Sequence, residues 1–76
     1  MLIQTEVGRA EVVAKQVAAL TGVVSSEYVT GPYDVVVRVG TDGPDAAKAD
    51  ALHAIVAAVQ GVEGITRTLT CPVVHL

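Results

Sequence analysis

The sequence is short of the side chains that usually stabilise a very small protein. Its 76 residues contain one cysteine, Cys71, so no disulfide can close within the chain, and they contain neither tryptophan nor phenylalanine. A domain of this size buries only about 60% of the surface that its unfolded chain exposes. Small domains usually gain stability from disulfides, metals or partner subunits. Because a disulfide is excluded, a bound metal or association with another subunit remains as the source of additional stability.

Positively charged residues are also scarce. Five Lys and Arg stand against eight Asp and Glu, which gives a formal net charge of -3. A protein that binds DNA or RNA normally presents a basic surface to the phosphates. We therefore expect no direct contact with nucleic acid.

Apolar residues are abundant but do not form long runs. They make up 51% of the sequence, while aromatic residues make up 3%. No run approaches the roughly 18 residues of a membrane-spanning helix. Glu6 and Arg9 interrupt the N-terminal segment too early for a signal-peptide core. We expect a soluble, cytoplasmic protein with no membrane partner, whose surplus of small apolar side chains contacts other subunits.

The pattern of apolar residues divides the chain into alternating strands and helices. Strands are predicted at 2–7, 23–30, 35–39 and 65–71, and helices from Gly8 to the stop at Gly22 and from 42 to the stop at Gly61. The first helix has apolar residues at Val13, Val17 and Leu20. Its outer face carries Glu11 and Lys15, four residues apart in the favourable order for an ion pair.

The second helix has a recognisable beginning and one apolar face. Residues 41–45 (Thr-Asp-Gly-Pro-Asp) are typical of a helix start, with Asp42 as the expected cap and Pro44 in the first turn. The apolar face consists of Ala49, Leu52, Ile55, Val56 and Val59.

These elements predict a single α+β domain over residues 1–76. The order βαββαβ is that of the ferredoxin-like fold, and residues 20–23 (Leu-Thr-Gly-Val) are similar to residues 62–65 (Val-Glu-Gly-Ile). Right-handed crossovers place both helices on one face of a four-stranded antiparallel sheet. The other face carries apolar groups that need a cover. We therefore expect a homodimer that packs sheet against sheet.

Three segments resemble the ligand-binding (RAM) domain of Lrp/AsnC regulators, in the type that stands alone as a single domain. They are residues 3–8 (Ile-Gln-Thr-Glu-Val-Gly), 29–34 (Val-Thr-Gly-Pro-Tyr-Asp) and 64–70 (Gly-Ile-Thr-Arg-Thr-Leu-Thr). The Gly-x-Tyr-Asp turn in the second segment is the most specific of these features. The similarity extends from one end of the chain to the other.

The resemblance implies both an assembly and a function. Dimers whose sheets face each other would assemble further, for example into an octamer of four dimers. Small effectors such as amino acids would bind between the dimers. The helix-turn-helix half that such regulators usually carry is missing, so the expected role in transcription is indirect. Full-length Lrp/AsnC regulators are a further candidate partner, and no cofactor is expected.

The predicted ligand-binding residues come from the hairpin turn and the last strand. They are Gly31, Pro32, Tyr33, Asp34, Thr66 and Thr68. The Asp34 carboxylate would accept hydrogen bonds from the ammonium group of an amino acid, and Gly31 would let the backbone approach the ligand closely. Without the resemblance, the same turn is explained as an ordinary hairpin connection. The threonines are equally explained by their preference for strands.

Metal and catalytic sites are not expected. His53, His75 and Cys71 lack the spacing of metal ligands, and Cys71 is predicted to be a small buried side chain. No clustered acid and base, no nucleophile beside a histidine and no phosphate-binding glycine loop is present. The competing hypotheses are a purely structural partner of full-length regulators, which needs no ligand, and a small dimeric enzyme.

Overall fold

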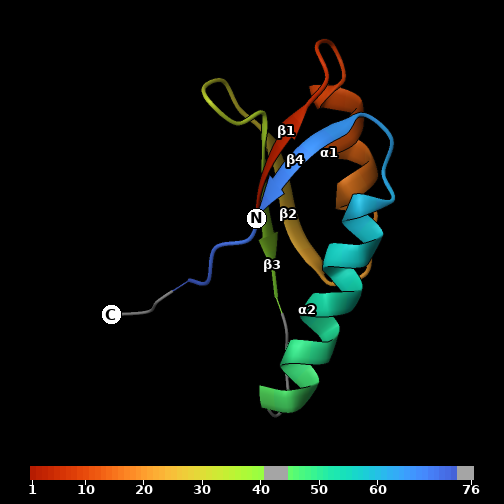
Figure 1. The fold of residues 1–76 in the computed structure, drawn as a ribbon, viewed down its shortest axis with the longest axis vertical. Coiled ribbons are helices and arrows are strands. Elements are labelled where there is room, and N and C mark those ends of the chain that lie inside the picture. Colours follow the sequence, from red (N-terminus) through yellow and green to blue (C-terminus); the bar gives the residue numbers. More distant parts are fainter. Residues whose placement is uncertain (41–44, 74–76) are drawn as a thin grey trace.

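The computed structural model describes residues 1–40 and 45–73 and has the expected ferredoxin-like order. Its elements are β1 (Leu2–Thr5), α1 (Ala10–Ala18), β2 (Val23–Tyr28), β3 (Val35–Val39), α2 (Asp45–Gln60) and β4 (Ile65–Leu69). The strands form a 4-stranded sheet in the order β2-β3-β1-β4, and each neighbouring pair is antiparallel. Both helices lie on the same side of this sheet (Figure 1). The prediction of the α+β fold is therefore confirmed.

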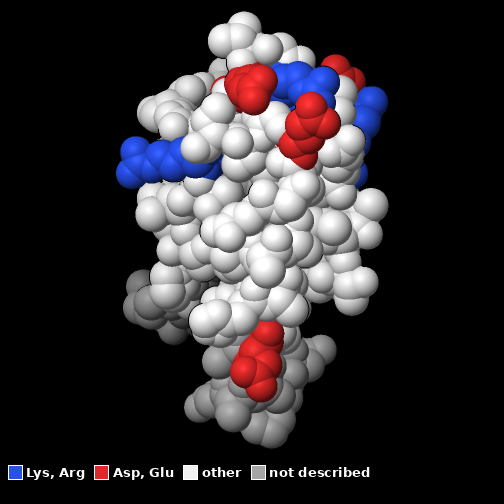
Figure 2. Space-filling model, turned by 45° about the vertical axis from the view of Figure 1, so that its right-hand side comes forward, with Lys and Arg blue, Asp and Glu red and all other residues white. Residues whose placement is uncertain are grey.

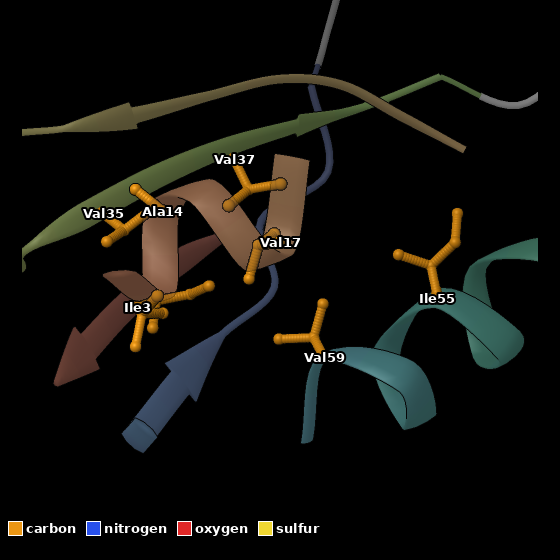
Figure 3. Close-up of a cluster of buried hydrophobic side chains, with 8 residues drawn as sticks. Ile3, Ala14, Val17, Val35, Val37, Ile55 and Val59 are labelled. Atoms are coloured by element: carbon orange, nitrogen blue, oxygen red, sulfur yellow. The ribbon is translucent and has the colours of Figure 1, made fainter. Parts of the chain in front are cut away.

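The core lies between the helices and one face of the sheet. Figure 3 shows aliphatic side chains from β1, β3, α1 and α2 pointing toward a common centre. The buried residues are Ile3, Val13, Ala14, Val17, Val35, Val37, Ile55 and Val59. All are aliphatic. Four of them, Val13, Val17, Ile55 and Val59, lie on the helix faces that the periodicity of the sequence predicts to be apolar.

The two helix-to-strand turns are similar in structure as well as in sequence. Gly22 precedes β2 with φ at 92°, and Gly64 precedes β4 with φ at 97°. Each turn packs against the helix of the other half. A Cβ on Gly22 would lie 2.5 Å from Cδ1 of Ile55, and one on Gly64 would lie 3.1 Å from Nε of Arg9. The repeated glycine therefore provides both a left-handed backbone and the space for close packing.

Helix α1 is shorter than the sequence predicts. It begins at Ala10 instead of Gly8, whose φ of 81° belongs to the turn after β1. It ends at Ala18, after which the N–H of Leu20 donates to the carbonyl of Val17 over 3.0 Å. Such a bond between residues three apart closes the helix with a tighter turn. The beginning expected for α2, around Asp42, lies outside the described residues.

Three strands also end earlier than the sequence predicts. Strand β1 ends at Thr5, and Val7 is fully exposed in the following turn, at 102% of its reference area. Strand β2 ends at Tyr28, where the hairpin to β3 begins. Strand β4 ends at Leu69, and its last pair with β1 joins Leu69 to Leu2, the first strand residue of β1.

Candidate functional site

A depression of about 490 Å³ lies at one end of the sheet, between the turn after β1, the first turn of α1 and the β2–β3 hairpin. Its lining residues are Thr5, Glu6, Val7, Gly8, Ala10, Glu11, Tyr28, Val29, Thr30, Gly31 and Asp34. Small-molecule sites in proteins usually have volumes of about 300–1,000 Å³. The depression is therefore large enough for a ligand the size of an amino acid.

Asp34 is held firmly at the edge of the depression. Its Oδ2 accepts a hydrogen bond from the backbone N–H of Thr5 over 2.8 Å and lies 3.3 Å from the Thr5 hydroxyl. Its own N–H donates to the carbonyl of Ile3 over 2.9 Å, and its carbonyl accepts from the N–H of Val29 over 2.8 Å. Asp34 thus connects β1 with both arms of the hairpin. No described residue bonds to Oδ1, so one carboxylate oxygen keeps its accepting capacity.

The other predicted hairpin residues differ in their relation to the depression. Gly31 lines it, and its φ of 140° is a conformation that favours glycine. The carbonyl of Pro32 accepts a hydrogen bond from Nε2 of Gln4 over 2.9 Å, which ties the hairpin to β1. Tyr33 is half-buried, and neither Pro32 nor Tyr33 is among the lining residues.

The predicted residues of β4 lie apart from the depression. Thr68 is half-buried opposite Ile3, whose side chain belongs to the core. Thr66 is exposed at an irregularity in the ladder, where Gln4 pairs with Arg67 and Thr5 pairs with Ile65. The structure therefore brings Gly31 and Asp34 together but does not place Thr66 or Thr68 beside them.

Several lining residues are absent from the sequence prediction. Tyr28 is 60% exposed and contributes the aromatic side chain of the depression, and Glu6 and Glu11 contribute two further carboxylates. Glu11 is already paired, since its Oε1 lies 3.2 Å from Nζ of Lys15. Strand alternation alone does not identify these residues, because β1 and β2 come close only through their separate contacts with β3.

Charged groups on the helix side of the molecule do not form a surface of one sign. Figure 2 shows Lys or Arg and Asp or Glu side chains intermixed at one end, with a broad uncharged surface below them. In the part of that face that the structure describes, charges of both signs therefore lie together.

The second notable surface is the face of the sheet that carries no helix, which we term the open face. Its apolar row crosses three strands, because Leu2 lies opposite both Val36 and Leu69. On β2, the residue next to this row is the acidic Glu27, which lies opposite Val36. Leu69 is 40% exposed, and Leu2 and Val36 are half-buried.

Two arginines flank the apolar row of the open face. Arg38 lies opposite Ser25 on one side, and Arg67 lies opposite Gln4 on the other. Both arginines and Glu27 are exposed. In the described part of the chain, an ion pair joins Lys15 and Glu11, and none of these three groups takes part in one.

The remaining candidate side chains do not assemble into a site within the described residues. No group of three or more His, Cys, Asp or Glu there could hold a metal ion. Cys71 is exposed, so the prediction that it is buried is wrong. The reason is that β4 ends at Leu69 and the chain then leaves the sheet (Figure 1). His53 is exposed on α2, and His75 lies outside the described residues.

No helix in the described residues is long and apolar enough to cross a membrane. In comparisons with known proteins, no protein-family model and no curated protein matches the chain. The fold thus defines the class, a ferredoxin-like α+β domain with one open sheet face and a depression beside its β2–β3 hairpin.

Proposed function

We propose that this protein is an oligomeric domain that binds a small effector of the amino-acid class and acts indirectly in transcriptional regulation. The observation that carries the proposal is the anchored Asp34 carboxylate at the edge of a depression of about 490 Å³. The resemblance of the sequence to stand-alone Lrp/AsnC ligand-binding domains supplies the regulatory context.

The arrangement of Asp34 suits an ammonium group. One oxygen is fixed by the N–H of Thr5, and the other is not engaged by any described residue. A carboxylate whose direction is set before the ligand arrives loses little conformational entropy on binding. Tyr28 offers an aromatic surface in the same depression for the apolar part of a ligand.

The open face supports association of two copies in the cytoplasm. Its apolar row includes Leu69, which is 40% exposed, beside the half-buried Leu2 and Val36. Apolar groups that lie together on a surface are stabilised when a partner covers them.

The first experiment is a thermal-shift screen of the twenty amino acids, combined with a mass measurement in solution. A ligand that binds only the native state stabilises it by about 2.7 kcal/mol at a concentration of 100 times Kd. A raised melting temperature with one or a few amino acids is the expected result. Stabilisation by none of them would contradict the proposed ligand class.

The second experiment tests Asp34 directly by calorimetric titration with the amino acid from the screen. Replacing Asp34→Asn keeps the shape of the side chain but removes its charge, and affinity should fall by roughly ten-fold to a hundred-fold. Glu63→Gln is the matched control, because Glu63 is exposed and does not line the depression. Unchanged affinity in a correctly assembled Asp34→Asn variant would refute the assignment.

A second candidate function is a structural partner that assembles with full-length Lrp/AsnC regulators and binds no ligand. It is favoured by the hydrogen bonds of Asp34 with Thr5, Ile3 and Val29. These bonds connect the strands and explain the presence of Asp34 without a ligand. Under this alternative, the protein dimerises normally but no amino acid raises its melting temperature.

A further inference from the structure

The charges on the open face are distributed unequally between its two edges. Glu27 lies on the edge strand β2, and Arg67 lies on the opposite edge strand, β4. Arg38 lies on β3, displaced along the strands to the side of the apolar row away from Arg67. One edge of the open face is thus acidic and the other is basic.

Facing sheets commonly pack with their strands nearly aligned. Two copies that pack by this face in that way are related by a two-fold axis that either crosses the strands or runs parallel to them. An axis that crosses the strands at the apolar row places each strand over the same strand of the second copy. Glu27 then lies over the second copy's Glu27. Like charges brought together at an interface are unfavourable. This arrangement is therefore opposed by the charges of the face itself.

An axis parallel to the strands exchanges the two edges. Strand β2 then lies over β4 of the second copy, and Glu27 lies over the second copy's Leu69, two residues along the strand from Arg67. Two residues of a strand span about 6.7 Å and facing sheets lie about 10 Å apart, so the long Glu and Arg side chains extend toward each other. The two-fold symmetry creates this contact twice.

The same axis also covers the apolar row. Strands β3 and β1 are the central strands, so exchanging the edges places Leu2 of one copy over Val36 of the other. The apolar groups are then buried in the middle while the charges lie at the periphery. This distribution of an apolar centre and a polar rim is the usual anatomy of a protein interface.

We propose that two copies of this chain pack open face to open face about an axis parallel to the strands, with Glu27 of each copy paired with Arg67 of the other. This inference rests on the proposed function for the existence of the dimer, and it adds the orientation and the residues that set it. The pairs lie at the rim, so they determine orientation more than they add affinity, and they weaken as salt rises.

The test uses charge reversal and mixing, followed by sedimentation or native mass spectrometry. The variants Glu27→Arg and Arg67→Glu each place like charges at both contacts, and each should dimerise roughly ten-fold more weakly than the wild type, or worse. An equimolar mixture of the two variants should form a heterodimer of wild-type affinity, because both contacts then join opposite charges. A chain carrying both reversals should form a homodimer again.

The control is Arg38→Glu, which changes the charge of the same face without touching the proposed pairs. On its own, Arg38→Glu should weaken dimerisation less than Arg67→Glu does. Mixed with Glu27→Arg, it should not restore dimerisation to wild-type affinity. Restoration by Arg38→Glu, or wild-type affinity in both single reversals, would refute the pairing. Circular dichroism of each variant verifies the fold. The variants Glu27→Gln and Arg67→Gln form a milder second set, in which each neutralisation should weaken dimerisation less than the charge reversal at the same residue.

The outcomes separate this inference from the proposed function. If the wild-type protein dimerises and binds an amino acid, but the charge-reversal variants dimerise with the same affinity as the wild type, only the orientation is contradicted. A wild-type protein that stays monomeric at micromolar concentration contradicts both the dimer and the pairing.

Discussion

The contact between Asp34 and Thr5 predicts a stability difference that is independent of any ligand. Replacing Asp34→Ala removes the acceptor of the Thr5 N–H, which is bonded at 2.8 Å and only partly buried. A hydrogen bond to a charged group contributes about 1.5–3 kcal/mol net, and partial exposure places this one toward the lower end, at about 1–2 kcal/mol. Asp34→Asn retains an amide oxygen at the same place and should cost about half as much, since charged hydrogen bonds are roughly twice as strong as neutral ones.

The assay is urea denaturation at one fixed protein concentration, because association contributes to apparent stability. For a domain of this size, 1 kcal/mol corresponds to roughly 4–8 °C in Tm, so a thermal scan resolves the series as well. Thr5→Val is the control, because it keeps the N–H and removes only the hydroxyl at 3.3 Å, and its effect should be small. Wild-type stability in Asp34→Ala would show that the contact contributes nothing and that the carboxylate is not fixed by Thr5.

Two further predictions concern the fold. Gly22→Ala should destabilise the protein more than Gly8→Ala: both residues have positive φ, which costs an alanine about 1–2 kcal/mol, but only at Gly22 would the new Cβ collide with Ile55. Equal losses in free energy of unfolding would show that the close approach of this turn to α2 is not maintained. Ile3→Ala, at a fully buried position, should cost about 2–5 kcal/mol, whereas Val12→Ala on the exposed side of α1 should change stability by about 0.5 kcal/mol or less. Similar values for the two variants in urea denaturation would contradict the assigned core.

The order of the elements and the helical part of the core could largely be predicted from the sequence. Val13 and Val17 are spaced as one face of a helix, and both are buried. Residues 35–39 were likewise predicted as a strand, in which Val35 and Val37 are the buried positions. The glycines at 22 and 64 mark the two turns in sequence and in structure. These features are predictable because helix periodicity, strand alternation and turn chemistry depend on residues that are neighbours in the chain.

The composition of the depression was decided only by the tertiary structure. Gly31 and Asp34 were identified from the hairpin, but Thr5 and Tyr28 belong to other strands, and their meeting with Asp34 depends on β1 and β2 both pairing with β3. The exposure of Cys71 has the same origin, because the ladder between β4 and β1 ends at the pair of Leu69 and Leu2, and Cys71 lies beyond it. Strand neighbours and register are contacts between distant parts of the chain. They follow from how the helices cover the sheet and from which side chains the core accommodates, and no local pattern encodes them.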